Sequence, residues 1–92
     1  MLAQSWLLSF TIEAEIDFKK LKPSYRAQVY KKLAWLAKNF NIITPLPLTG
    51  PWQGFFKLRL GNLRIIYKAD YQKSLIVIYV IGQRDKIYKQ RR

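Results

Sequence analysis

Residues 55–67 read FFKLRLGNLRIIY, two runs of alternating apolar and basic residues joined by Gly61-Asn62. A Gly-Asn pair between two such runs predicts a β-hairpin with a two-residue loop, and this loop fixes which residues of the two strands face each other. The predicted register gathers apolar side chains on one face, where they can join a core. The opposed apolar pairs are Leu60 with Leu63, Leu58 with Ile65, and Phe56 with Tyr67.

The opposite face of the same hairpin is basic. Its register places Arg59 opposite Arg64, with Lys57 two residues further along the first strand. Like charges directly opposed on a sheet destabilise it, so two guanidiniums in this position indicate that an anion belongs between them. Phosphate is the natural candidate, because arginine offers a fork of donors and lysine a mobile point charge.

Length and charge favour one basic domain with a polyanionic partner. The 92 residues suffice for a single core, so we expect one domain over residues 1–92. Seventeen Lys and Arg residues against five acidic ones give a formal charge of +12. A domain this basic usually binds nucleic acid or an anionic membrane, although a small cationic protein can also carry such charge without a polyanion.

The chain contains neither cysteine nor histidine, which excludes disulfides, thiolate nucleophiles and zinc-ribbon sites. Three of its acids cluster near the N-terminus, while Asp70 and Asp85 stand far apart in sequence, a poor basis for a two-metal nuclease. We therefore predict no metal and no cofactor. No run approaches the ~20 apolar residues of a membrane span, and residues 1–10 lack the basic start of a signal peptide. The expected location is the cytoplasm.

The order of elements predicts an α+β fold. Residues 4–10 alternate as a first strand, Thr11 caps a helix that Pro23 ends, and Ser24 caps a second helix. The second helix carries an apolar stripe of Val29, Leu33, Leu36 and Phe40. The asparagines, prolines and glycine of residues 39–51 mark an irregular loop before the hairpin, and residues 75–81 form a last strand covered on both faces. We expect the order βααβββ, with two helices on one face of a mainly antiparallel four-stranded sheet.

The basic hairpin face could also cleave RNA. A metal-free ribonuclease must activate the ribose 2′-hydroxyl and stabilise the charge that develops on the scissile phosphate. Lys57 is the group of this cluster that could act as the base, since two nearby guanidiniums favour its neutral form. Arg59 and Arg64 would act by electrostatics, because arginine keeps its proton.

Further basic and aromatic residues extend the predicted site. Arg84 and Tyr88 follow the last strand, where Arg84 could add a cation and Tyr88 a platform on which a base stacks. Alternatively, Arg84 forms an ion pair with Asp85, and Tyr88 packs the C-terminus. The second helix carries lysines that either track phosphates or form an ordinary solvated face. The predicted RNA-binding residues outside the catalytic set are Lys31, Lys32, Lys38, Lys68 and Lys86.

Three segments, in order and at matching spacing, carry a resemblance to a known family. They are residues 18–33 with the two basic helices, residues 56–67 with the hairpin, and residues 80–88, VIGQRDKIY. Together they resemble the RelE/ParE superfamily of toxins from bacterial toxin–antitoxin pairs, in its RelE-like branch. The match runs over nearly the whole chain. Two positions depart from the family pattern: Arg59 stands where RelE has a lysine, and Gln83 replaces a histidine common among relatives.

The resemblance implies a ribosome-dependent endoribonuclease that enters the vacant A site and cuts mRNA, which halts translation. It also implies a cognate antitoxin, with operator DNA bound only through the antitoxin complex. By position, Lys57 and Arg59 match two basic strand positions and Arg64 matches the phosphate-stabilising arginine. Arg84 matches a second essential arginine, and Tyr88 matches the terminal tyrosine that orients or stacks on the nucleotide.

Three alternatives remain open on the sequence. A ParE-like inhibitor of DNA gyrase would share the fold without nuclease chemistry. A non-catalytic RNA-binding module would use the same aromatic and basic strand, although residues 53–56 lack the basic residue and the spacing of an RNA-recognition strand. A degenerate toxin would retain antitoxin binding alone.

Overall fold

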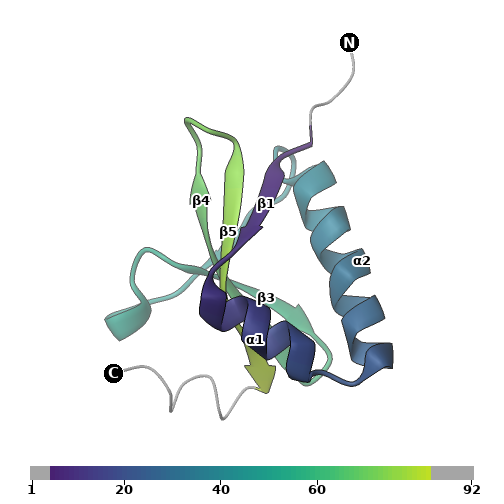
Figure 1. Cartoon of the computed structure of the whole chain (residues 1–92). Coiled ribbons are helices and arrows are strands. Elements are labelled where there is room, and N and C mark those ends of the chain that lie inside the picture. Colours follow the sequence, from purple (N-terminus) through teal and green to yellow (C-terminus); the bar gives the residue numbers. More distant parts are fainter. Residues whose placement is uncertain (1–4, 84–92) are drawn as a thin grey trace.

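The computed structural model describes residues 5–83, and Figure 1 shows how their helices and strands are arranged. Strand β1 and two consecutive helices come first, followed by a short strand, a 3-10 helix and three longer strands. The bounds are β1 Leu7–Phe10, α1 Ile12–Lys20, α2 Pro23–Asn39, β2 Leu46–Pro47, the 3-10 helix Gly50–Trp52, β3 Phe56–Leu60, β4 Leu63–Asp70 and β5 Leu75–Gln83.

Within the described residues the strands form one mixed sheet in the order β1-β5-β4-β3-β2. β1 pairs parallel with β5, and the remaining neighbours pair antiparallel. The α+β class and the helix placement are confirmed, but the prediction of four strands was one short. The additional strand is β2, which lies inside the loop that was expected to be irregular. Its two residues pair with Phe56 and Lys57 of β3. Proline is tolerated there because β2 lies at the sheet edge.

The start of α1 is as predicted, whereas the start of α2 is not. Thr11 caps α1, and its Oγ1 accepts a hydrogen bond from the Ala14 amide at 3.1 Å. The N-cap of α2 is Lys22, which makes no side-chain capping bond, and Pro23 is the first helical residue. The assignment of Ser24 as the cap was therefore wrong. Proline suits the first helical position because its φ is already helical and its missing N–H would have had no partner.

The principal core lies between the helices and one face of the sheet. The predicted stripe on α2, Val29, Leu33, Leu36 and Phe40, is entirely buried. It packs with Leu63, Ile65 and Tyr67 of β4, and with the partly buried residues Phe56, Leu58 and Leu60 of β3. The apolar face predicted for the hairpin is thus confirmed as a core face.

A second, smaller apolar cluster covers part of the other sheet face. Trp52 and Phe55, from the segment before β3, bury Ile66 of β4 completely. Tyr79 is an extra residue in β5 where the pairing with β4 shifts, and its ring meets Phe55 edge-on at 4.9 Å between centroids. This cluster supplies the cover predicted for the far side of the last strand, and it leaves only part of that face open.

The first strand is shorter than predicted. β1 begins at Leu7, and Trp6 before it is buried, with its Nε1 donating to Asn41 Oδ1 at 2.9 Å. The Trp6 amide also donates to the Ala37 carbonyl of α2 at 2.9 Å. These bonds hold Trp6 against α2 rather than in the sheet. The predicted start of this strand at residue 4 lies outside the described residues.

Candidate nucleic-acid interface

The hairpin has the predicted register. Residues 61 and 62 form the turn, and Arg59 pairs directly with Arg64 across the strands. Gly61 adopts a φ of 59°, a conformation that a side chain disfavours. The turn chemistry of Gly61 therefore sets the pairing that brings the two arginines together.

Arg64 is held close to the turn by its own hairpin. Its Nη1 donates to the Gly61 carbonyl at 2.8 Å and to the Leu63 carbonyl at 2.9 Å. These carbonyl oxygens take up part of the positive charge, which eases the repulsion from Arg59. The opposed arginines are thus accommodated by backbone acceptors, and the half-buried Arg64 keeps further donors for an anion.

Lys57 and Arg59 border a cleft at the edge of the sheet. The cleft measures about 240 Å³, and Lys32 and Trp35 of α2 lie on its helix side. Because β2 pairs only with Phe56 and Lys57, the adjacent edge of β3 is open toward α2 in the described part of the chain. Side chains from both faces of β3 therefore border the same hollow, which was expected to lie on the open sheet face alone.

The remaining predicted residues divide between this cleft and other surfaces. Lys31 borders a neighbouring hollow of about 340 Å³ that also includes Lys32 and Trp35. Lys38 is exposed in the last turn of α2 and is not among the residues that line either hollow. Lys68 lies apart, with its ammonium 4.6 Å from the Phe55 ring centroid. Three predicted residues, Arg84, Lys86 and Tyr88, lie outside the described residues.

Trp35 was missed by the sequence analysis. It lies off the apolar stripe of α2, yet it is a large aromatic residue between lysines of the same helix. The Lys32 ammonium lies 4.5 Å from the centroid of its ring. An aromatic residue among lysines on the polar side of an amphipathic helix was the signal that could have identified it.

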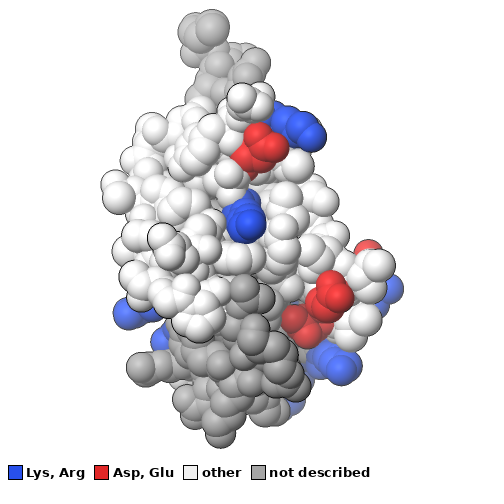
Figure 2. All heavy atoms as spheres, turned by 90° about the vertical axis from the view of Figure 1, so that its left-hand side faces the viewer, with Lys and Arg blue, Asp and Glu red and all other residues white. Residues whose placement is uncertain are grey.

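The described lining of the cleft carries no counter-charge. Among residues 5–83, no aspartate or glutamate borders it. Two acids are engaged elsewhere, since Asp17 Oδ2 accepts the Ile81 amide at 3.1 Å and Asp70 Oδ1 accepts the amides of Gln72 and Lys73. On the face shown in Figure 2, the cations at the upper right and lower right lie beside acidic groups, and one near the centre is surrounded by neutral atoms. The cleft is therefore distinguished by several unopposed cations around one hollow.

Tyr67 forms part of the cleft wall but cannot serve as its base. Its ring is almost fully buried, and this burial, with a smaller contribution from the Tyr71 phenol, raises the pKa of Tyr67 above its ordinary value of 10.0. The phenol therefore keeps its proton at neutral pH. Lys32 and Lys57 are both among the described residues that border the cleft.

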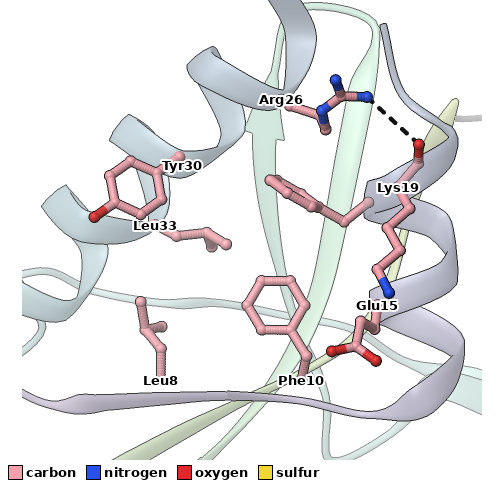
Figure 3. A pocket seen from close by; sticks show the side chains of 8 residues that line it. Leu8, Phe10, Glu15, Lys19, Arg26, Tyr30 and Leu33 are labelled. Carbon is pink, nitrogen blue, oxygen red and sulfur yellow. Dashed lines mark hydrogen bonds between the residues drawn. The ribbon is translucent and has the colours of Figure 1, made fainter. Parts of the chain in front are cut away.

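A larger apolar groove lies elsewhere, between β1, α1 and α2 (Figure 3). It measures about 600 Å³ and has Leu8, Phe10, Phe18 and Leu33 along its walls. Glu15, Lys19, Arg26 and Tyr30 complete its lining. Arg26 is directed to backbone, since its Nη1 donates to the carbonyls of Lys19 and Leu21. With mixed charge and an apolar lining, this groove does not suit a phosphate chain.

Two classes of site are not found within residues 5–83. The side chains of these residues form no group of three or more potential metal ligands. None of the helices in this range has the length and apolar character required to cross a membrane.

Solved structures share this fold. The chain is similar to the RelBE2 toxin–antitoxin complex of Mycobacterium tuberculosis, with a TM-score of 0.79 and 27% identity, covering 88% of this chain and 93% of that chain. For the isolated RelE toxin of E. coli the TM-score is 0.73 with 22% identity, covering 94% of each chain. For a YafQ variant from E. coli it is 0.69 with 19% identity, covering 88% of this chain and 96% of that chain. A comparison with curated proteins found no match.

Two helices on one face of a mixed sheet, with a basic hairpin formed by β3 and β4, give this chain the fold class of the RelE toxins. A family model described as the ParE toxin of the type II toxin–antitoxin system parDE matches residues 8–88. The chain belongs to this family, and the resemblance inferred from the sequence is confirmed.

Proposed function

We propose that this toxin is a metal-independent endoribonuclease that cleaves mRNA in the ribosomal A site and thereby stops translation in the cytoplasm. The observation that carries the proposal is the grouping of Lys57 and Arg59 at one cleft, beside the Arg59–Arg64 pair, with no acidic residue among the described residues that line the cleft. Such a grouping suits a phosphodiester whose charge increases in the transition state.

The chemistry assigned to these residues is an attack by the ribose 2′-oxygen on the adjacent phosphorus. Lys57, acting as the general base, takes the proton of the 2′-hydroxyl, and the new O–P bond forms as the bond to the 5′-oxygen breaks. Arg59 and Arg64 stabilise the added negative charge. The leaving 5′-oxygen takes up a proton from solvent water, and the product is a 2′,3′-cyclic phosphate, or the form that results when water hydrolyses it. Roles for Arg84 and Tyr88 stay predictions.

The test is to add the purified protein to ribosomes translating a defined mRNA and to map the new mRNA ends. We expect cuts within codons occupying the A site, together with resistance of the same mRNA when ribosomes are omitted. Lys73→Ala is a charge-matched control, since Lys73 is exposed in the turn between β4 and β5, away from the hairpin tip. Intact message at catalytic doses of toxin would refute the proposal.

Gyrase inhibition is the second candidate function, because the family model that matches is described as a ParE toxin. In this alternative the basic cleft would engage its target without bond cleavage. A gyrase supercoiling assay separates the two functions: inhibition of supercoiling together with uncut mRNA would establish the alternative.

The partner we propose is a cognate antitoxin, encoded by an adjacent reading frame. Solved relatives include toxin–antitoxin complexes of the RelBE type, and a basic toxin requires an acidic partner to neutralise it. We assign the apolar groove between β1, α1 and α2 to this antitoxin, since its exposed apolar lining suits a protein segment better than RNA. Operator DNA would be bound only through the antitoxin.

A further inference from the structure

Helix α2 extends the basic cleft along its length. The hollow bordered by Lys57 and Arg59 and the neighbouring hollow bordered by Lys31 share two residues, Lys32 and Trp35. The two hollows therefore form one continuous surface from α2 to β3. In the described part of the chain, its lining includes four cations, Lys31, Lys32, Lys57 and Arg59, and no acidic residue. A ligand in contact with the hairpin cations can follow this surface onto the helix.

Trp35 is the unusual residue of this surface. The other two tryptophans, Trp6 and Trp52, are buried, whereas Trp35 keeps 44% of its surface exposed. Tryptophan normally buries most of its area, so an exposed indole is informative when it adjoins a functional cleft. The Lys32 ammonium lies 4.5 Å from its ring centroid, which places a cation and an aromatic face within one nucleotide's reach.

We propose that this surface holds single-stranded RNA adjoining the cut site, with one base stacked on Trp35 and neighbouring phosphates on Lys31 and Lys32. The choice of RNA as the ligand rests on the proposed function, and the residues of this surface also favour RNA. Flexible strands are bound by aromatic platforms that stack bases and by cations that follow the backbone, and both are present here. Trp35 is thus a binding residue that positions the substrate strand, and the chemistry stays with the hairpin.

The test uses a fluorescein-labelled RNA of about twelve nucleotides, within the range of known single-strand sites, and measures its anisotropy on binding the full-length protein. Trp35→Ala should weaken binding by about 5-fold or more, the lower end of the contribution of one base stack. Trp35→Phe, which keeps an aromatic ring, should retain most of the affinity. Tyr25→Ala is the matched control, because Tyr25 lies on the same helix with 43% exposure and borders neither hollow.

A second RNA analogue separates stacking from charge. When the bases are removed from the oligonucleotide, the loss caused by Trp35→Ala should disappear, while Lys31→Ala should weaken binding of both ligands. The dependence of binding on salt should also become shallower for Lys31→Ala, by about 0.7 in log–log slope for one lost phosphate contact. Circular dichroism and the melting temperature of each variant show that it is folded.

Several results would overturn the inference. Unchanged affinity of folded Trp35→Ala, or equal losses with normal and abasic RNA, would exclude stacking on the indole. Protection of Trp35 from acrylamide quenching by the antitoxin but not by RNA would assign the surface to a protein. If the wild type cuts mRNA while Trp35→Ala binds normally, only the stacking role fails. If RNA binding depends on Trp35 but ribosome-bound mRNA stays intact, only the nuclease proposal fails.

Discussion

Arg59 of β3 lies directly opposite Arg64 of β4, one residue pair away from the turn at Gly61. Arg64 bonds to the turn carbonyls of Gly61 and Leu63, whereas Arg59 is exposed beside the cleft that it shares with Lys57. The hairpin therefore holds one guanidinium in place by its backbone and leaves the other accessible. This arrangement concentrates positive charge at the tip of the sheet, where a phosphate can approach.

Removing the Arg64 guanidinium should abolish activity while the fold persists. Arg64→Ala should lower mRNA cleavage by about 100-fold or more, comparable to removing one donor to a developing oxyanion. Two hydrogen bonds to carbonyls are lost, each contributing about 0.5–1.5 kcal/mol, and relief of the repulsion from Arg59 offsets part of this loss. Cleavage assays and thermal melts should separate the two effects. A large loss of stability that accounts for the lost activity would contradict this role.

Cleavage of mRNA should depend on the ability of Lys57 to act as a base. Lys57→Arg keeps the positive charge but removes the base, so cleavage should fall by about 100-fold or more with RNA affinity nearly retained. Lys32→Arg is the comparison variant, since Lys32 borders the same cleft from α2. Normal cleavage by Lys57→Arg combined with loss in Lys32→Arg would transfer the base role to the helix lysine.

The turn should depend on glycine at position 61. A Cβ built there meets no atom within 4 Å, so substitution introduces only backbone strain at a φ of 59°. Gly61→Ala should lower the free energy of unfolding by about 1–2 kcal/mol, a decrease in melting temperature of roughly 4–16 °C. Gly61→Asn should lose less, because asparagine adopts this conformation more readily. Equal melting temperatures for wild type and Gly61→Ala would show that the turn differs from the one described.

Stability should fall at alkaline pH because of Tyr67. Burial raises the pKa of Tyr67 in the folded state, whereas in the unfolded chain it returns to about 10. Below pH 10 both states hold the proton and the contribution is constant. Above pH 10 the unfolded state is favoured by ionisation, so the free energy of unfolding decreases as pH rises.

Urea unfolding at a series of pH values between about 8 and 11 measures this decrease. Tyr67→Phe should make the free energy of unfolding less dependent on pH in the alkaline range. Tyr25→Phe, at an exposed position of α2, should retain the wild-type slope. An identical slope in Tyr67→Phe would show that ionisation of other groups causes the alkaline loss.

The apolar groove should discriminate between the two proposed partners. Tyr30 borders the groove with 71% of its surface exposed, and it is absent from the lining of the basic cleft. Tyr30→Ala should weaken binding of the co-expressed product of the adjacent reading frame by about 10-fold while leaving RNA affinity unchanged. Calorimetry with that protein and anisotropy with RNA provide the two measurements. The reverse pattern would place RNA in the groove.

Features governed by local chemistry were predictable from the order of residues. Gly61-Asn62 specified a two-residue turn and with it the pairing of Arg59 with Arg64, because turn geometry dictates strand register. Thr11 could be recognised as a cap, since its hydroxyl satisfies an amide three residues away. The buried stripe of α2 followed from helical periodicity alone. Each of these depends on contacts along a short stretch of chain.

Packing between distant segments determined the remainder. Strand β2 formed because the neighbouring edge of β3 offered hydrogen bonds to a proline-rich loop. The position of Trp35 beside Lys57 joins residues of α2 and β3 that are remote in sequence. Periodicity identifies which face of a helix or strand is apolar. Which residues lie beside its polar face depends on how whole helices and strands dock, and the free energy of that docking comes from contacts throughout the core.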